Sequence, residues 1–365
     1  MRFLFIEPYY GGSHKVFCDG LEKHSNHKIE ILKLSAENFK WRIRGSSWYF
    51  KKKIKNIFDY DGIIMTDMIN LSDFRALYKK KIPPVLFYFH ENQLDYPLAS
   101  NQKIDYHLCF ANINSALSSD LLYFNSKTHK QSFLKSLNNI ISRMPKNDFD
   151  VSWVKTAIKE KSEFIYPGCD FSFKVCHEKK PDKTPVILWN HRWDHDKNPE
   201  DFFKILSFLK NDKIEFKLII LGEKGPKKNT VFYEAKKKFS KEIIHFGYVK
   251  DKKEYFRLLQ MSDIALTTSV QENFGYSVLE AIYSGCVPVL PQRLSYPEII
   301  NGKYHKMVLN QNLSSMYKMV KNYLLNPSLL NQGWVKELRK DIEKFSWTEM
   351  ILKYDELLEK LAKLK

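Results

Sequence analysis

The chain has 365 residues, of which 44% are hydrophobic and 15% aromatic, enough to build two domains with hydrophobic cores and to exclude a disordered protein. Its 59 Lys and Arg residues against 42 Asp and Glu residues give a net charge of +17. This charge favours polyanionic partners such as RNA or an anionic bilayer, although a lysine-rich composition alone produces it in many proteins.

Short apolar runs of strand length alternate with segments of helical spacing along the whole chain. In the first half they predict strands at 2–7, 28–34, 62–66, 84–90, 121–125 and 163–167, and helices at 105–118 and 127–140. A polar, proline-containing stretch at 168–185 is typical of a linker. The second half predicts strands at 186–191, 216–222, 243–249, 263–269 and 287–291, and helices at 312–325, 328–342 and 346–364.

Near-continuous apolar strands separated by helices indicate parallel sheets that are buried on both faces. The sequence therefore predicts an α/β protein with two Rossmann-like, doubly wound domains and a ligand crevice beyond the carboxyl ends of the strands. We expect an N-terminal domain at 1–175, a second domain at 176–345, and a C-terminal helix at 346–365 that can pack back on the first domain.

The cysteines and the N-terminus bear on the compartment. The five cysteines include no C-x-x-C pair, so neither a disulfide framework nor a zinc site is predicted. Only four apolar residues separate Arg2 from Glu7, and no stretch approaches the ~20 apolar residues that a membrane span needs. We therefore expect a cytoplasmic protein with no stable membrane insertion.

The stretch SVQENFGYSVLEAIYSG (269–285) places Glu272 and Glu280 around an Asn-Phe-Gly turn where an apolar strand gives way to a helix. The first backbone N–H groups of a helix and the positive end of its dipole form a ready anion site. Carboxylates beside an anion need another partner, and sugar hydroxyls are suitable. Taken singly, Glu272 could equally meet the helix dipole, and Glu280 could be a solvated carboxylate.

Arg192 and Lys197 follow the predicted strand at 186–191 on one loop. A guanidinium and an ammonium five residues apart suit a diphosphate, because they neutralise the leaving group as its bond breaks. The letters DHD at 194–196 match D-x-D, but they lie inside this basic loop and are interpreted as structural. An ordinary charged loop is the simpler alternative for each residue alone.

Further polar residues follow two strands of the first half. Gly11 and Gly12 come after strand 2–7 and would let the backbone approach a phosphate, although they do not form G-x-G-x-x-G. Strand 84–90 ends in HENQ, which delivers His90, Asn92 and Gln93 to the same edge of the sheet. Each could be a simple turn or strand-end residue, but their convergence at strand carboxyl ends favours a site.

The segment KWRIRGSSWYFKKKIK (40–55) holds seven basic residues and no acidic one, interleaved with Trp41, Trp48, Tyr49 and Phe50. Arginine and aromatic side chains can grip phosphates and stack on unpaired bases, as recognition of an RNA loop requires. Two alternatives stay open. The segment could be a solvated helix face whose aromatic residues pack into the core, or a surface that docks on anionic lipid.

At this point the residues resemble a known pattern. ENFGYSVLEAIYSG resembles the E-x-F-G-x-x-x-x-E-A-x-x-x-G motif of retaining glycosyltransferases of the GT-B fold, family 4, and Arg192 with Lys197 matches their basic pair. The segments IEPYYGGSHK, FKWRIRGSSWYF, LFYFHENQLDYP and HRWDHDKNPEDFF are similar to the tRNA-queuosine mannosyltransferase family, known also as the glycosyltransferase-like domain-containing group. With YPEI (296–299) and FSW (345–347), the likeness spans nearly the whole chain.

The resemblance implies two GT-B domains that face across a cleft, with an acceptor-binding domain at 1–175 and a nucleotide-sugar-binding domain at 176–345. It implies transfer of mannose from GDP-mannose to queuosine in a tRNA anticodon, that of tRNA-Asp, with retention at the anomeric carbon. The implied partners are a tRNA carrying queuosine and the nucleotide-sugar donor, and we expect a monomer. No cofactor and no metal are implied, because the basic pair and the helix N-terminus would do the work of Mg²⁺.

Carried over residue by residue, the resemblance assigns three sets of residues. The catalytic set is Glu272, Arg192, Lys197 and His90, with His90 near the anomeric centre. The donor-binding set is Gly11, Gly12, Arg192, Lys197, Glu272, Asn273, Phe274, Gly275 and Glu280, with Glu272 at the donor sugar and Glu280 at the nucleotide ribose. The acceptor-binding set is Trp41, Arg42, Arg44, Lys51, Asn92 and Gln93.

Two other functions remain open from the sequence. One is a peripheral membrane transferase of family 4 that acts on a lipid or a surface glycan. The other is a non-catalytic RNA-binding protein on a GT-B scaffold, which the intact Glu272, Glu280, Arg192 and Lys197 argue against. The choice of GDP over UDP and of mannose over galactose rests on the resemblance alone.

Overall fold

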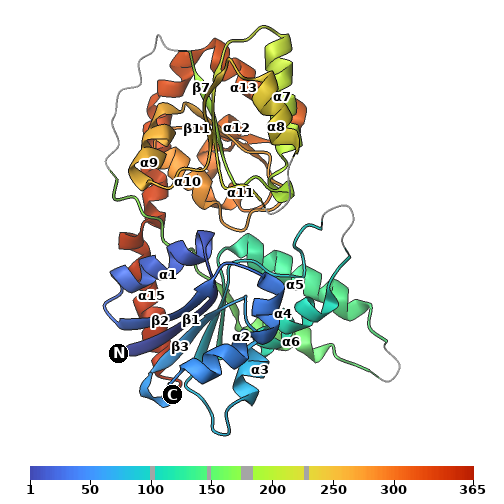
Figure 1. Cartoon of the computed structure of the whole chain (residues 1–365), viewed down its shortest axis with the longest axis vertical. Helices are drawn as coiled ribbons and strands as arrows, with labels where there is room; N and C mark the ends of the chain where they lie inside the picture. The colour runs from blue at the N-terminus through green and yellow to red at the C-terminus, as the bar shows by residue number, and fades with distance from the viewer. Residues whose placement is uncertain (99–102, 146–148, 174–183, 226–229) are drawn as a thin grey trace. The chain divides into compact units, whose positions relative to one another are not determined.

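The computed structural model describes residues 1–98, 103–145, 149–173, 184–225 and 230–365. The chain divides into two compact units, Met1–Gly168 with Phe345–Lys365, and Cys169–Lys344. The last helix, red in Figure 1, therefore belongs to the unit that the blue and green segments build. The predicted junction between 175 and 176 lies outside the described residues, as does most of the predicted linker.

The first unit is built on a six-stranded parallel sheet in the order β2-β1-β3-β4-β5-β6. Its strands are β1 (Arg2–Tyr10), β2 (Lys28–Ser35), β3 (Gly62–Thr66), β4 (Val85–Phe89), β5 (Leu121–Phe124) and β6 (Ser162–Phe164). Its helices are α1 (Gly12–His24), α2 (Phe39–Lys53), α3 (Leu71–Ala76), α4 (Tyr106–Ser118), α5 (Lys127–Ser142), α6 (Trp153–Lys161) and α15 (Trp347–Ala362), with a 3-10 turn at Ile57–Asp59.

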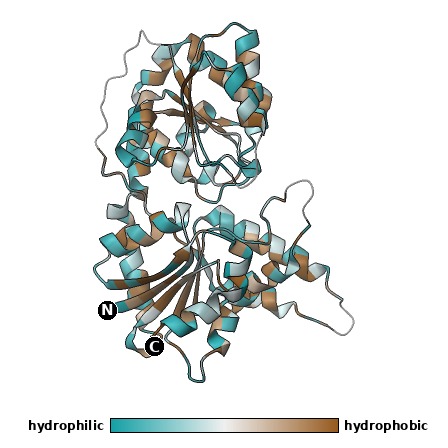
Figure 2. Ribbon diagram, viewed as in Figure 1, coloured by the Kyte–Doolittle hydropathy of each residue, from teal (hydrophilic) through white to brown (hydrophobic). Residues whose placement is uncertain are grey.

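Both faces of this sheet are buried, which explains why its strands are apolar throughout. Leu4 and Ile6 of β1 point into one core, and Phe3 and Phe5 into the other, since side chains alternate along a strand. Helix α15 closes the second core: the Tyr354 hydroxyl donates a hydrogen bond to the Tyr166 carbonyl over 3.1 Å. Figure 2 shows the result as brown strands covered by helices of mixed hydropathy.

The second unit has the same plan, a six-stranded parallel sheet in the order β12-β11-β10-β7-β8-β9. Its strands are β7 (Val186–Asn190), β8 (Lys217–Leu221), β9 (Ile243–Gly247), β10 (Ile264–Leu266), β11 (Val287–Pro291) and β12 (Leu309–Asn310). Its helices are α7 (Pro199–Asn211), α8 (Thr230–Lys238), α9 (Lys252–Met261), α10 (Tyr276–Tyr283), α11 (Tyr296–Ile299), α12 (His305–Val308), α13 (Leu313–Leu325) and α14 (Gly333–Asp341). Short 3-10 turns lie at His195–Lys197, Gly302–Tyr304, Pro327–Asn331 and Ile342–Phe345.

The predicted α/β class with two doubly wound domains is confirmed, and each predicted strand is present. Two details differ. Strand β12 was not predicted, because two residues are too few to form a recognisable apolar run. The single helix expected over 328–342 is a 3-10 turn followed by α14. Within the described residues, no helix combines the length and hydropathy needed to cross a membrane.

Candidate active site

The loop after β7 holds a buried cation. The Nζ atom of Lys197 lies 2.7 Å from the Gln271 carbonyl oxygen, 3.1 Å from Asp196 Oδ2 and 3.4 Å from Glu272 Oε2, and the residue is 9% exposed. Burial opposes the charge, but the Glu272 and Asp196 carboxylates outweigh it and raise the pKa of Lys197. Lys197 is therefore a fixed positive charge beside Glu272.

Asp196 ties this loop to the loop after β10. Its backbone oxygen accepts hydrogen bonds from the N–H groups of Val270 and Gln271, and its buried carboxylate lies 3.9 Å from Arg192 Nη2. Arg192 itself is half-exposed, with 53% of its side chain in solvent, so its guanidinium remains accessible to a ligand. Asp194 accepts from the His195 N–H. Both carboxylates of the DHD segment are thus engaged inside the loop, as its structural interpretation expects.

Gly275 turns the chain from the Glu272 loop into α10. Its φ of +106° lies in the left-handed region, which a side chain disfavours, and a Cβ there would sit 3.2 Å from Ile299 Cδ1. Phe274 before it is buried, and its carbonyl accepts from the Ser295 hydroxyl. The positive end of α10 therefore begins beside Glu272 and Lys197, the combination that the sequence predicts for an anion site.

Glu280 lies further along α10 and has its own partners. The Tyr255 hydroxyl donates to Glu280 Oε2 over 2.6 Å and accepts from Asn190 Nδ2 over 2.9 Å. Burial raises the pKa of Glu280 to about 7, and the hydrogen bond from Tyr255 acts against that rise. Tyr255 was not predicted as a site residue, because a tyrosine in the middle of an amphipathic helix carries no local pattern that marks it.

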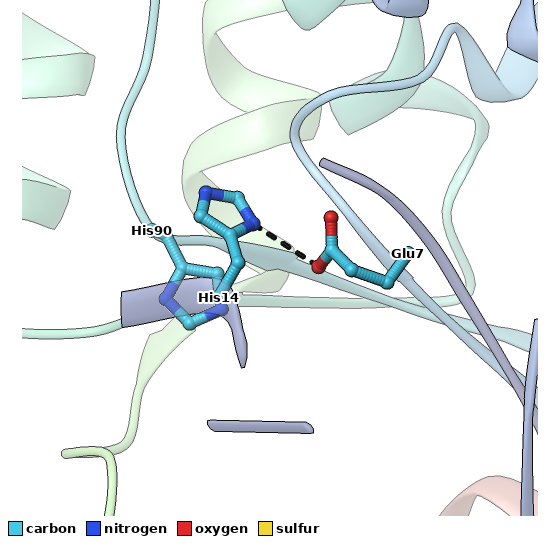
Figure 3. Close-up of side chains that lie close together, drawn as sticks. All are labelled: Glu7, His14 and His90. Carbon is cyan, nitrogen blue, oxygen red and sulfur yellow. Dashed lines mark hydrogen bonds and ion pairs between the residues drawn. The ribbon is translucent and has the colours of Figure 1, made fainter. Parts of the chain in front are cut away.

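In the first unit, Glu7, His14 and His90 gather at the carboxyl ends of β1 and β4 (Figure 3). The fully buried Glu7 accepts at Oε2 from His14 Nδ1 over 3.0 Å and from Thr66 Oγ1 over 2.9 Å, and at Oε1 from the Tyr9 N–H over 2.8 Å. The His14 and His90 rings are tilted against each other with centroids 4.3 Å apart. His90, predicted from the sequence, therefore packs on an ion pair that was not predicted.

The charges of this cluster are set by burial and by Glu7. Burial opposes a charge on His14, but Glu7 outweighs it and raises the pKa of His14 to about 9. Burial, and then the charge of His14, lower the pKa of His90 well below its usual value. Burial raises the pKa of Asp67 to about 7, and one of its oxygens accepts from the His90 N–H over 2.8 Å. His90 is therefore a neutral imidazole at neutral pH, held beside an imidazolium.

This cluster is also the one group of three metal-ligand side chains found among the residues that the structure describes. The candidate ligand atoms of Glu7, His14 and His90 lie within 4.8 Å of one another. A carboxylate and two imidazoles could ligate zinc. The 3.0 Å contact between Glu7 and His14, however, is that of a charged hydrogen bond, and Glu7 accepts two further bonds. Metal-independent activity, expected from the sequence, stays a prediction.

Gly11 and Gly12 connect β1 to α1. Gly11 is extended, and the place of a Cβ on it is occupied by Ala36 Cβ at 2.5 Å. Gly12 has φ of +50° and open space within 4 Å of where its Cβ would be. The start of α1 is therefore free of side-chain bulk at Gly12, and His14 projects from its first turn. A phosphate contact for the two glycines stays a prediction.

The predicted acceptor residues fall into two groups. Trp41, Arg42, Arg44 and Lys51 lie on α2, and Trp41 is 76% exposed. The Arg42 guanidinium donates to Ser35, the Arg44 guanidinium donates to Asp105, and the Lys51 ammonium lies 4.2 Å from the Tyr78 ring centroid. The alternative in which the aromatic residues of α2 pack into the core holds for Phe50 and is wrong for Trp41, Trp48 and Tyr49, which are exposed.

Asn92 and Gln93 form the other group, in the loop after β4. Asn92 is buried: its Nδ2 lies 2.9 Å from His129 Nε2, and its Oδ1 accepts from the backbone of Leu94 and Asp95. Gln93 is partly buried, and its N–H donates to Asn112 Oδ1 over 2.8 Å. Asn92 shapes this loop, so contact with an acceptor would require these bonds to break.

Comparisons with known proteins bear on both units. A family model described as glycosyl transferases group 1 matches residues 173–343. Sucrose-phosphate synthase from Thermosynechococcus elongatus superimposes with a TM-score of 0.78 at 13% identity over 100% of both chains. Anabaena HepE, solved in complex with UDP and glucose, gives 0.68 at 13% identity over 99% of this chain and 100% of that one. At these identities the structures establish the fold alone, and together with the family match they define a glycosyltransferase of the GT-B class.

Matches that include the first unit define the kind of glycosyltransferase more closely. A family model described as tRNA-queuosine alpha-mannosyltransferase N-terminal matches residues 2–169. The tRNA-queuosine alpha-mannosyltransferase of Drosophila melanogaster is 30% identical over 374 residues, covering 98% of this chain and 96% of that protein. The chain belongs to the tRNA-queuosine alpha-mannosyltransferase family.

Proposed function

We propose that this protein transfers mannose from GDP-mannose to queuosine in the anticodon of a tRNA, with tRNA-Asp as the acceptor and retention at the anomeric carbon. The observation that carries the proposal is the likeness to the Drosophila tRNA-queuosine alpha-mannosyltransferase, which covers 98% of the chain and therefore both units. The new bond joins the anomeric carbon to a queuosine hydroxyl oxygen. The bond from that carbon to the β-phosphate oxygen breaks, the proton of the queuosine hydroxyl is released, and GDP leaves.

The departing diphosphate needs positive charge, and Lys197 and Arg192 are suited to supply it. Lys197 keeps its charge because two carboxylates offset its burial, and Arg192 is exposed enough to reach a phosphate. The start of α10 at Gly275 adds the positive end of a helix dipole, with the amides of Asn273, Phe274 and Gly275 near it. Preorganised charges of this kind stabilise a leaving group without reorganisation during the reaction. We therefore propose transfer without a divalent metal.

The two glutamates of α10 and its preceding loop would bind hydroxyls of the donor. Glu272 lies beside Lys197, and we assign it to the mannose hydroxyls. Glu280 has one oxygen engaged by Tyr255, so the carboxylate is oriented while its other oxygen can accept from a ribose hydroxyl. This second role requires the ionised carboxylate, so donor affinity should rise with pH through about 7.

For His90 we propose the role that the family likeness implies, near the anomeric carbon of the donor. A neutral imidazole suits that place, because the developing positive charge at the anomeric carbon would be repelled by an imidazolium. Glu7 and His14 are proposed as positioning residues: they fix the ring against which His90 packs. Gly11 and Gly12 would allow the diphosphate to approach the start of α1.

A peripheral membrane transferase and a non-catalytic RNA-binding protein are less well supported, since family membership favours an enzyme that acts on tRNA. We further propose that the protein acts in the cytoplasm as a monomer. The test is mass spectrometry of tRNA nucleosides from cells with and without the gene. We expect a hexosyl-queuosine that disappears on deletion and returns with the wild-type gene; its persistence in the deletion strain would contradict the proposal.

A further inference from the structure

The solvent-exposed face of α2 carries two tryptophan side chains. Trp41 is 76% exposed and Trp48 is 69% exposed. Ile43, Ser46, Ser47 and Phe50 occupy the buried side of the same helix. Tryptophan side chains bury large apolar area in most folded proteins, so two exposed indoles on one helix face leave apolar surface available to a partner.

The two indoles lie on one stripe. Seven residues are close to two full turns of an α-helix, so Trp41 and Trp48 project from the same face, about 10 Å apart along the axis. Helical side chains lean toward the N-terminus, and Trp48 does so: a Cβ built on Gly45 would lie 3.9 Å from the Trp48 ring. Gly45 therefore lies on the helix surface between the two indole positions.

Gly45 lowers the stability of α2, and neither its backbone conformation nor a close contact requires a glycine there. In a helix interior it destabilises by roughly 0.5–1 kcal/mol relative to alanine. Gly45 lies in the middle of Phe39–Lys53, and its φ is not among the positive values that would demand glycine. Its effect is to leave the helix surface between positions 41 and 48, which are about 10 Å apart along the axis, without a side chain.

The positive charges around the two tryptophans indicate what kind of ligand they bind. Helix α2 carries Lys40, Arg42, Arg44, Lys51, Lys52 and Lys53 and no acidic residue. Arg44 and Lys40 are both oriented by Asp105, at 3.1 Å and 3.3 Å, on the side of the stripe near Trp41. Lys52 and Lys53 follow Trp48 at the other end. Cations at both ends of an aromatic stripe match a nucleic-acid strand, whose phosphates flank its bases.

We propose that Trp41, Gly45 and Trp48 form a stacking site for unpaired nucleobases of the RNA acceptor, with the flanking Lys and Arg side chains on its phosphates. The proposal deepens the proposed function and rests on it in one respect, namely that the acceptor is an RNA loop. A lipid surface fits less well, because the exposed positions of α2 hold four aromatic residues and four cations and include no Leu, Ile or Val. An interfacial helix presents a continuous apolar face instead.

The test uses the full chain and an RNA hairpin with an anticodon-sized loop, with a blunt duplex of the same composition as the control ligand. Trp41→Ala and Trp48→Ala should each lower affinity for the hairpin about 5- to 150-fold, which corresponds to ~1–3 kcal/mol for each stacked base. Duplex affinity should change little, because a duplex offers no free base. Both residues are exposed, so thermal midpoints and GDP affinity should stay at the wild-type values.

Gly45 supplies a matched pair of variants that removes neither a ring nor a charge. Gly45→Ala places a methyl group at ordinary contact distance from Trp48 and should bind the hairpin as the wild type does. Gly45→Leu should cover the helix surface between the two indole positions and lower hairpin affinity at least fivefold, while both substitutions stabilise the helix. If Gly45 has only a structural role, hairpin affinity should be unchanged by either substitution.

One result would overturn the inference, namely a Trp41→Ala/Trp48→Ala double variant that binds the hairpin with wild-type affinity. If that variant also loses binding to vesicles containing phosphatidylserine, the stripe is a lipid contact instead. Failure of the proposed function looks different: the wild-type protein would bind RNA and yet form no mannosyl-queuosine.

Discussion

The loop around Lys197 and the face of α2 both concentrate positive charge, but they hold it in different ways. Lys197 is buried among Asp196 and Glu272, which fix its position and protonation. Arg44 is half-exposed and paired with Asp105 across the surface. A buried charge acts at full strength on one ligand atom, whereas an exposed one is screened by salt and contributes little alone. The first arrangement suits catalysis, and the second suits the grip of a long polyanion.

The largest effect should come from removing the buried cation, Lys197. Lys197→Ala removes a preorganised charge from the leaving group and should lower kcat on the order of 10²- to 10³-fold. It also leaves Glu272 without this cation and Asp196 with Arg192 alone at 3.9 Å, which should destabilise the fold by about 3 kcal/mol. Arg192→Ala is the matched control: it should lower kcat similarly and leave urea unfolding nearly unchanged, since Arg192 is half-exposed. Near-normal turnover in either variant would refute the role assigned to that residue.

The Glu7–His14 pair extends the comparison to the first unit and predicts a pH dependence. The pKa of His14 is raised from 6.5 to about 9 in the folded protein. Its stabilising contribution is therefore fully present below pH 6.5 and lost as pH rises through about 9, amounting to about 3 kcal/mol. Glu7→Gln should flatten the fall in unfolding free energy across this window, measured by urea titration at several pH values. An undiminished slope in Glu7→Gln would show that the pH dependence does not come from the Glu7–His14 pair.

A smaller effect is expected from Tyr255→Phe, which removes the hydroxyl that orients Glu280. The hydrogen bond lowers the pKa of Glu280, so its loss should move the ionisation above pH 7. GDP affinity at pH 7 should fall roughly 2- to 10-fold, as for loss of one ordinary hydrogen bond of ~0.5–1.5 kcal/mol. Calorimetric titrations across pH should show the rise in affinity displaced to higher pH. An unshifted curve would separate Glu280 from nucleotide binding.

Substitutions of the cations on α2 should have weaker effects, and these effects should depend on the salt concentration. Replacing Arg42 and Arg44 together by alanine should lower tRNA affinity several-fold and reduce the slope of log affinity against log salt by about 2, if each residue neutralises one phosphate. Donor affinity should not change. If both affinity and slope stay as in the wild type, these two arginines serve only Ser35 and Asp105.

The smallest effect should come from chelation. Activity should survive EDTA and gain little from Mg²⁺ or Mn²⁺, because protein groups supply the charge. Complete loss that a divalent ion restores would mean that the site contains a metal. Glu7, His14 and His90 would then be the first ligands to test.

Much of the fold could be predicted from the sequence, because strands buried on both faces leave unbroken apolar runs such as GIIMT and VLFYF. The end of each apolar run also marks the end of its strand. The sequence could therefore place four site residues at strand ends: Arg192, Lys197, Glu272 and His90. Glu7, His14 and Tyr255 could not. Their importance lies in partners distant in the chain, as with Tyr255 and Glu280, or in a burial that no local pattern reports.

The burial of individual residues was the least predictable property. Asn92 and Gln93 look alike in sequence as polar residues after a strand, yet Asn92 is fully buried against His129. Trp41 and Phe50 are both aromatic residues of α2, yet one is exposed and the other is in the core. A weak helical period, broken by Gly45 and two serines, does not show which ring faces inward.

The most direct test of the central claim is reconstitution. Purified protein is incubated with queuosine-containing tRNA and isotopically labelled GDP-mannose, and the digested nucleosides are analysed by mass spectrometry. We predict labelled mannosyl-queuosine, with little product from UDP-galactose or from tRNA that lacks queuosine. If labelled product is absent with GDP-mannose, or forms equally on tRNA without queuosine, the proposed transfer of mannose to queuosine is contradicted.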